Sequence, residues 1–250
     1  MINKPTKNVK PDRLLQLGLV VALACTAPAC ASENKTGKHL FILSGQSNMT
    51  DTVRDAFTDR VQDYFGERNV VVVMRMKSGR GIRFWVADYG QPAGRGLTDN
   101  KMNSNGQEYK PLIKAVMAVA KDQSFDTVGF IWMQGESDAN NRLSEVYEES
   151  FIKLIEQLEK DQGRDDLYFV IGRINDYARS RPDNEHWHRV RKSQVRLGNS
   201  KGNAWIDTDD LNDGKNRRGK DIKNDLHYSA EGYKTLGKRF AEACLIAIGK

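Results

Sequence analysis

One serine, Ser47, stands in the small polar segment 45–48, Gly-Gln-Ser-Asn, directly after the apolar run 39–43. A serine hydroxyl is a weak nucleophile at neutral pH and needs an adjacent base to accept its proton. Histidine suits that role because its ordinary pKa lies near neutral pH. His227, in a polar loop before the last helical stretch, is the candidate base. These residue types indicate nucleophilic catalysis by Ser47.

Two further segments place glycine or polar residues directly after apolar runs. Gly79 follows the run 69–76, and Gln134 and Glu136 follow the run 125–133. In an open parallel sheet, the ligand crevice lies beyond the carboxyl ends of the strands. Acyl transfer also needs N–H donors that face the developing oxyanion. The backbone N–H of Gly79 and the side-chain amide of Gln134 are the candidate donors.

The elements that must position these residues alternate along the chain. Five nearly continuous apolar runs predict strands at 39–43, 69–76, 125–133, 166–174 and 203–207. Helical spacing is present at 55–67, 108–122, 143–161 and 185–198, and again from about Ala230. Continuous apolar runs favour parallel strands that are covered on both faces. The pattern predicts an α/β fold, a three-layer α/β/α sandwich around a mostly parallel, flavodoxin-like five-stranded sheet.

Two polar segments are predicted to be loops. Residues 86–107 are rich in Gly, Asn and Asp, and loops of this length near a site often shape access to it. Residues 214–221 form a basic run, which we interpret as a solvated loop; contact with an acidic polysaccharide is the alternative.

The N-terminus has the layout of a secretory signal peptide over residues 1–31. A basic start precedes an apolar run that ends in small residues, with Ala29 and Ala31 as the cleavage pattern. The run is too short for a stable membrane span. We expect an exported protein, periplasmic or secreted, whose single domain covers residues 32–250. The alternative is a lipoprotein anchored at Cys25.

The charge and the cysteine content give no indication of a nucleic-acid-binding, zinc-binding or disulfide-stabilised protein. The net charge is +6, but four basic residues and one acidic residue lie in the signal peptide, which leaves +3. This small excess gives no argument for nucleic acid. Cys244 is the lone cysteine of the mature chain, and no Cys/His cluster has zinc-like spacing. We therefore expect no metal, no organic cofactor and no internal disulfide; nothing in the sequence specifies an oligomeric state.

Several segments together resemble the SGNH hydrolase superfamily, and within it the sialate O-acetylesterases and family 6 carbohydrate esterases. These are GQSNM (45–49), KSGRGIRFW (77–85), WMQGESD (132–138), the His227 loop and SAEGYKTLGKRFAEA (229–243). The resemblance spans nearly the whole mature chain. It implies an esterase acting on an acetylated carbohydrate.

The resemblance also implies roles for single residues. Ser47 matches the nucleophile and contributes its backbone N–H to the oxyanion hole, with Gly79 and Gln134 as the other donors. Gln134 stands where asparagine stands in other branches of the superfamily. His227 matches the general base. Gln46 and Asn48, which flank the nucleophile, are the predicted substrate-binding residues.

The chain departs from the family at the acid of the triad. The usual acid lies three residues before the histidine, where this chain has Asn224. An asparagine can accept a hydrogen bond from the imidazole but lends it no charge. Three alternatives stay open: Asp225 reaches the ring through a shifted loop, Glu136 orients it, or Ser47 and His227 act without a carboxylate.

The function predicted from these residues is removal of acetyl groups from a glycan through an acetyl-enzyme. One alternative is a lipase-like or thioesterase-like SGNH enzyme on acyl esters, although the segment 86–107 lacks the apolar residues that would line an acyl tunnel. The other alternative is a catalytically inactive carbohydrate-binding relative, which the asparagine at position 224 keeps open.

Overall fold

The computed structural model describes residues 37–94, 104–178 and 184–249. All of them belong to one compact unit, Ala31–Lys250. The predicted signal peptide, including Cys25, lies outside the described residues, as does part of the predicted loop at 86–107.

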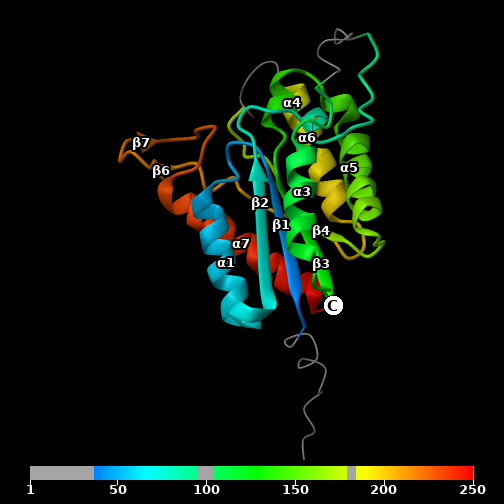
Figure 1. Cartoon of the computed structure of the whole chain (residues 1–250). Helices are drawn as coiled ribbons and strands as arrows, with labels where there is room; N and C mark the ends of the chain where they lie inside the picture. Colours follow the sequence, from blue (N-terminus) through cyan, green and yellow to red (C-terminus); the bar gives the residue numbers. More distant parts are fainter. Residues whose placement is uncertain (1–36, 95–103, 179–183, 250) are drawn as a thin grey trace, which may run out of the picture. The chain divides into compact units, whose positions relative to one another are not determined.

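The central sheet has five parallel strands in the order β2-β1-β3-β4-β5. The strands are β1 (His39–Gly45), β2 (Val70–Met76), β3 (Thr127–Met133), β4 (Tyr168–Gly172) and β5 (Ala204–Ile206). Gly45 pairs with Met76 on one side and Met133 on the other, so the three strands that precede the predicted site residues end at one level. The predicted α/β fold with a parallel five-stranded sheet is confirmed (Figure 1).

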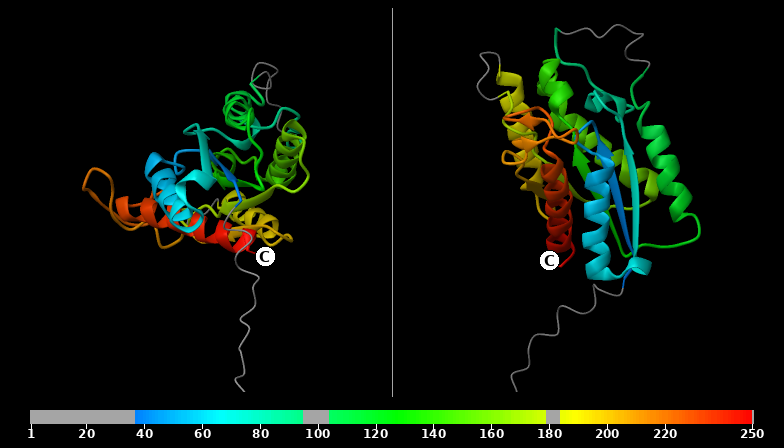
Figure 2. Two further views of the ribbon diagram at one scale, coloured as in Figure 1. Left: turned by 60° about the horizontal axis from the view of Figure 1, so that its bottom comes forward. Right: turned by 90° about the vertical axis from the view of Figure 1, so that its left-hand side faces the viewer.

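Helices cover both faces of the sheet. They are α1 (Asp51–Phe65), α3 (Tyr109–Ala120), α4 (Glu136–Asn140), α5 (Tyr147–Gln162), α6 (Glu185–Gly198) and α7 (Ala230–Ile248), with short 3-10 turns η2 (Glu67–Asn69), η3 (Ile82–Phe84) and η4 (Ser144–Val146). Helices α1 and α7 pack together on one face, whereas α3, α5 and α6 lie on the other (Figure 2). The strand order reverses at β1, because β2 lies on one side of it and β3, β4 and β5 follow on the other. The crevice of a doubly wound sheet forms at such a point.

The core follows from the apolar stripes of the helices. An apolar residue recurs at every fourth position along α1, and all four are buried: Val53, Phe57, Val61 and Phe65. Phe151, Leu154, Ile155 and Leu158 recur at threes and fours along α5 and are buried in the same way. Full burial of each large apolar side chain contributes about 1.5–3 kcal/mol to folding. Cys244 is a free cysteine and lies buried in this core.

Helix α1 begins earlier than predicted, at Asp51 instead of residue 55. The hydroxyl of Thr50 accepts a hydrogen bond from the Val53 N–H at 3.4 Å and so caps the helix. The apolar periodicity does not reveal this first turn, because its residues other than Val53 are polar. The earlier start brings the helix N-terminus close to Ser47.

The basic segment 214–221 is largely exposed, as predicted for a solvated loop, and its two ends pair as a short hairpin that the sequence pattern does not reveal. Strands β6 (Gly214–Lys215) and β7 (Asp221–Ile222) pair antiparallel, and an ion pair joins Lys215 to Asp221 at 2.9 Å. The Asn216 side chain closes the turn by accepting hydrogen bonds from the N–H groups of Arg218 and Lys220. The strands are two residues long each, too short to show an alternating pattern.

Within the three described ranges, no helix combines the length and the apolar character that crossing a membrane requires.

Candidate active site

Ser47 lies in a tight turn between β1 and α1. Gly45 ends the strand with φ +141°, and a Cβ there would stand 2.0 Å from the Met133 carbonyl oxygen. The Gln46 N–H donates to that same carbonyl at 2.9 Å, and the Met49 N–H donates to the Gln46 carbonyl at 2.9 Å. These backbone contacts hold the serine at the carboxyl edge of the sheet.

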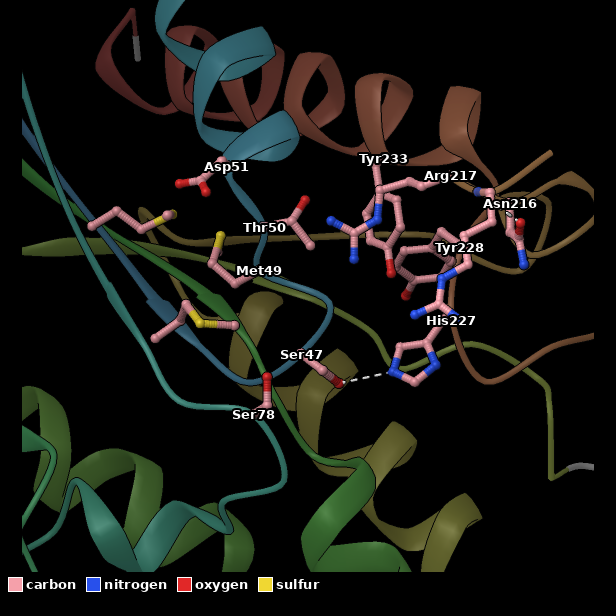
Figure 3. A pocket seen from close by; sticks show the side chains of 13 residues that line it. Ser47, Met49, Thr50, Asp51, Ser78, Asn216, Arg217, His227, Tyr228 and Tyr233 are labelled. Carbon is pink, nitrogen blue, oxygen red and sulfur yellow. Dashed lines mark hydrogen bonds between the residues drawn. The ribbon is translucent and has the colours of Figure 1, made fainter. Parts of the chain in front are cut away.

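The His227 ring meets this serine from the opposite end of the chain. Its Nε2 lies 3.1 Å from Ser47 Oγ, across 180 residues of sequence (Figure 3). The histidine precedes α7, whose N-cap is Ser229. The distance is within hydrogen-bonding range, as proton transfer from the hydroxyl requires. The structure thus brings together the two side chains on which the predicted chemistry depends.

Asp225 is the acidic group nearest to the histidine among the described residues. Its Oδ1 lies 4.0 Å from His227 Nδ1, too far for a hydrogen bond, and accepts the His227 backbone N–H at 2.9 Å. Both side chains are nearly half exposed, at 42% and 49%, so water screens their charges. Asn224, in the place of the family's usual acid, has φ +44° and accepts the Asn212 amide at 3.3 Å.

Glu136 is buried beneath the site, at the start of α4. Burial raises the pKa of its carboxyl, and one oxygen accepts the Asn48 amide at 2.7 Å. The other oxygen has no partner among the described residues. The Asn48 amide also donates to the Leu226 carbonyl at 3.2 Å, next to His227. Glu136 therefore reaches the histidine loop through Asn48.

Gln46 and Asn48 lie inside the protein, at 4% and 1% exposure. Gln46 Oε1 accepts the Gln134 amide and the Ser137 N–H, each at 3.2 Å. Asn48 Oδ1 accepts the Tyr233 hydroxyl at 3.0 Å. Both side chains thus hold the nucleophile turn in a buried network, and their predicted contact with substrate stays a prediction.

The three predicted oxyanion donors differ in their surroundings. Among the described residues, the backbone N–H groups of Ser47 and Gly79 donate no hydrogen bond. Gly79 is exposed, with φ +70°, in the turn after β2. Gln134 is fully buried, and its amide donates to Gln46, Asp138 and the Arg80 carbonyl. An oxyanion role for this amide stays a prediction and requires it to give up one of those partners.

Asp138 links the turn after β2 to the segment after β3. Its carboxylate accepts the Ile82 N–H at 2.9 Å as well as the Gln134 amide. It is fully buried, which raises its pKa to about 6. The motif around Gln134 contains this residue, but only the fold reveals that it contacts the turn after β2.

A cavity of about 610 Å³ opens beside the Ser47–His227 pair. Its lining comes from two groups of segments: the segment after β1 with the end of β2 and the turn that follows it, and the hairpin with the start of α7 (Figure 3). The first group consists of Met49, Thr50, Asp51, Met74, Met76 and Ser78, and the second of Asn216, Arg217, Arg218, Tyr228 and Tyr233. The Arg217 guanidinium lies 5.2 Å from the centre of the Tyr233 ring. The hairpin arginines belong to the basic run for which contact with an acidic polysaccharide was the alternative interpretation.

The five strands of the sheet are parallel, and the serine and the histidine meet at its carboxyl edge. The predicted fold class is therefore confirmed.

The chain belongs to the family described as "Carbohydrate esterase, sialic acid-specific acetylesterase", which it matches over residues 52–246. It is accordingly an esterase of the acetylesterase kind. The match covers His227, Asp225 and Glu136, whereas Ser47 precedes it. No curated protein matches the chain by sequence.

Solved structures that are similar to this chain include the following two. A protein from Arabidopsis thaliana is 17% identical with a TM-score of 0.60, over 84% of this chain and 98% of its own. A carbohydrate acetylesterase from Xanthomonas citri is 17% identical with a TM-score of 0.62, over 84% of this chain. The present chain spans only 57% of that enzyme's length. Likeness at this identity shows a shared fold.

Proposed function

We propose that this protein removes acetyl groups from a carbohydrate by nucleophilic catalysis at Ser47. The observation that carries the proposal is the 3.1 Å contact between His227 Nε2 and Ser47 Oγ beside an open cavity, in a member of an acetylesterase family.

The proposed steps conserve protons and bonds. Ser47 Oγ attacks the acetyl carbonyl carbon while His227 Nε2 takes the hydroxyl proton, and the negative charge on the carbonyl oxygen faces the N–H groups of Ser47 and Gly79. The imidazolium then returns its proton to the departing sugar oxygen, which leaves an acetyl-enzyme. Water repeats the sequence and releases acetate. Every proton moves between the chain, the substrate and water, so the scheme needs no cofactor.

The charge of the cavity supports a sugar that carries a carboxylate, such as a sialic acid. Arg217 and Arg218 line the cavity, and neither forms an ion pair with any described residue. A guanidinium matches the two oxygens of a carboxylate in a fork-like pair of hydrogen bonds. Asp51, the acidic residue of the lining, is already paired with Arg54 at 2.8 Å.

The methionines at the other side of the cavity favour a second candidate substrate. Met49, Met74 and Met76 offer thioether side chains that adapt to apolar groups. They would suit an ester with an acyl chain longer than acetyl. A series of p-nitrophenyl esters separates the two candidates: the proposed function predicts the highest rate with acetate, and the second candidate predicts a longer acyl chain.

Release of acetate from an acetylated glycan tests the proposed function. Ser47→Ala should lower turnover at least about 1000-fold, because removal of a catalytic serine costs up to about 10⁶-fold in comparable enzymes. Ser78→Ala is the matched control, since this serine lines the same cavity without contacting His227. Equal rates for wild type and Ser47→Ala would refute the proposal, and an unlabelled Ser47 after treatment with a fluorophosphonate would favour the inactive carbohydrate-binding relative.

We propose export on the basis of the predicted signal peptide at residues 1–31 alone. N-terminal sequencing of the mature protein should find a start near Ser32. A lipid-modified Cys25 at the N-terminus would establish the lipoprotein alternative instead.

A further inference from the structure

The position of the His227 ring is not explained by contacts of the ring itself. Among the described residues, its one hydrogen bond goes to Ser47, and the Asp225 carboxylate at 4.0 Å is beyond bonding distance. A half-exposed ring on a loop needs some other restraint if its nitrogen is to stay near the serine hydroxyl. The backbone just before the ring provides that restraint.

Asn175, from the segment after β4, donates its side-chain amide to two carbonyls of this backbone. The distances are 3.1 Å to Asp225 O and 3.3 Å to Leu226 O. Asn175 is 1% exposed. The backbone carbonyl of Asn175 accepts the Trp187 indole N–H at 2.7 Å, so a buried tryptophan of α6 holds the asparagine in place.

Asn212, from the segment after β5, holds the same loop from another direction. Its side-chain amide donates to Asp225 O at 3.1 Å, and its backbone carbonyl accepts the Asp225 N–H at 3.2 Å. It is 2% exposed. Together with the contact from Asn48 to Leu226 O, amides from the ends of three different strands converge on two adjacent carbonyls.

Asparagine is suited to this task. A short side chain with two N–H donors can serve two neighbouring carbonyl oxygens at once, and an aspartate in its place could only repel them. Both asparagine side chains are buried, so breaking these hydrogen bonds would leave buried donors without partners, which is costly. A loop held in this way stays near one geometry although its side chains face water.

We propose that Asn175 and Asn212 are positioning residues of the active site, which act on His227 through the carbonyls of Asp225 and Leu226. The inference rests on the proposed Ser47–His227 mechanism. Without either amide, the loop is free to shift and the 3.1 Å contact between imidazole and hydroxyl lengthens. A misplacement of about 1 Å at reacting groups can cost roughly 100-fold in rate.

Measuring each asparagine variant in two backgrounds distinguishes a positioning role from a general loss of stability. Asn175→Ala and Asn212→Ala are each made in the wild type and in His227→Ala, and hydrolysis of p-nitrophenyl acetate is measured. In the wild type, each should lower kcat by about 10- to 100-fold with little change in KM. In His227→Ala, each should leave the residual rate within about 2-fold, because residues that act as one unit are strongly non-additive.

Leu158→Ala is the control for lost stability, since Leu158 is fully buried in α5, a helix on the opposite face of the sheet from α7. At a matched loss in Tm, it should leave the activity of the folded enzyme unchanged. The positioning role is refuted if both asparagine variants lower the rate by the same factor in the wild type and in His227→Ala. It is also refuted if neither variant lowers the rate in either background. Two different asparagines are used so that one variant that fails to fold leaves the other to decide. Ser47→Ala in the same assay reports separately on the proposed mechanism, because full activity there would refute the mechanism whatever the asparagines do.

Discussion

The two halves of the active site are built in different ways. The nucleophile half follows a central strand, and backbone contacts with β3 fix its turn. The histidine half is a loop outside the central sheet, and it is held mainly by side-chain amides, with one backbone hydrogen bond from the Asp225 N–H to the Asn212 carbonyl. Ser47 is surrounded by buried neighbours, whereas His227 is half exposed. Substitutions near the serine should therefore disturb folding, while substitutions near the histidine should disturb the rate and leave the fold intact.

The largest effect is expected at Gly45. Gly45→Ala places a Cβ 2.0 Å from the Met133 carbonyl oxygen, in a backbone conformation that alanine rarely adopts. The strand end cannot move without breaking the sheet, so we expect a loss of more than about 4 kcal/mol in the free energy of unfolding. Urea denaturation and the yield of folded protein measure it.

Gly163→Ala is the control for backbone strain alone. Gly163 also has positive φ, but a Cβ there meets no atom within 4 Å among the described residues. It should cost about 1–2 kcal/mol, the usual penalty for a left-handed residue. Equal losses at the two glycines would mean that the close approach to β3 does not restrain the nucleophile turn.

An intermediate effect is expected at the acid of the histidine half. Asp225→Asn keeps an oxygen for the His227 N–H but removes the charge 4.0 Å from the ring, so we expect kcat to fall about 10-fold. Glu136→Gln keeps an oxygen for the Asn48 amide and alters a buried group that does not contact the ring. Its kcat should fall less than about 3-fold, since the conserved shape preserves the hydrogen bond.

Steady-state kinetics of the two variants rank the acids, with thermal unfolding as the check on folding. A much larger loss in Glu136→Gln would assign the orienting role to Glu136 acting through Asn48. Full activity in both variants would leave Ser47 and His227 as a pair that acts without a carboxylate.

The smallest effect is expected at the hairpin that adjoins the histidine half. The double variant Arg217→Ala/Arg218→Ala should raise KM for an acetylated acidic sugar roughly 3- to 10-fold, because exposed ion pairs contribute modestly. Hydrolysis of p-nitrophenyl acetate should not change. The difference should shrink at high salt, which screens exposed charges.

Lys220→Ala is the matched control, because Lys220 is an exposed cation of the same hairpin that does not line the cavity. An equal rise in KM for neutral and acidic sugars would show that the hairpin contributes shape and not charge.

Much of this architecture could be predicted from local pattern. The apolar runs placed all five strands of the sheet, and the motifs predicted that Ser47 and His227 would meet. The hairpin β6–β7 was missed because two-residue strands carry no periodicity. Asn175 and Asn212 were missed because a single asparagine after a strand is typical of any turn.

The amino-acid sequence by itself determined the order of strands and helices, because hydrophobic periodicity is a property of neighbours along the chain. It also determined which side chains at the sheet edge could do chemistry. The tertiary structure alone decided which of them touch: Asp225 and not Asn224 lies beside the histidine, Glu136 binds Asn48, and the hairpin arginines face the cavity. These contacts join residues far apart in the chain, and their geometry arises only when the packed helices and sheet bring the loop ends to one edge.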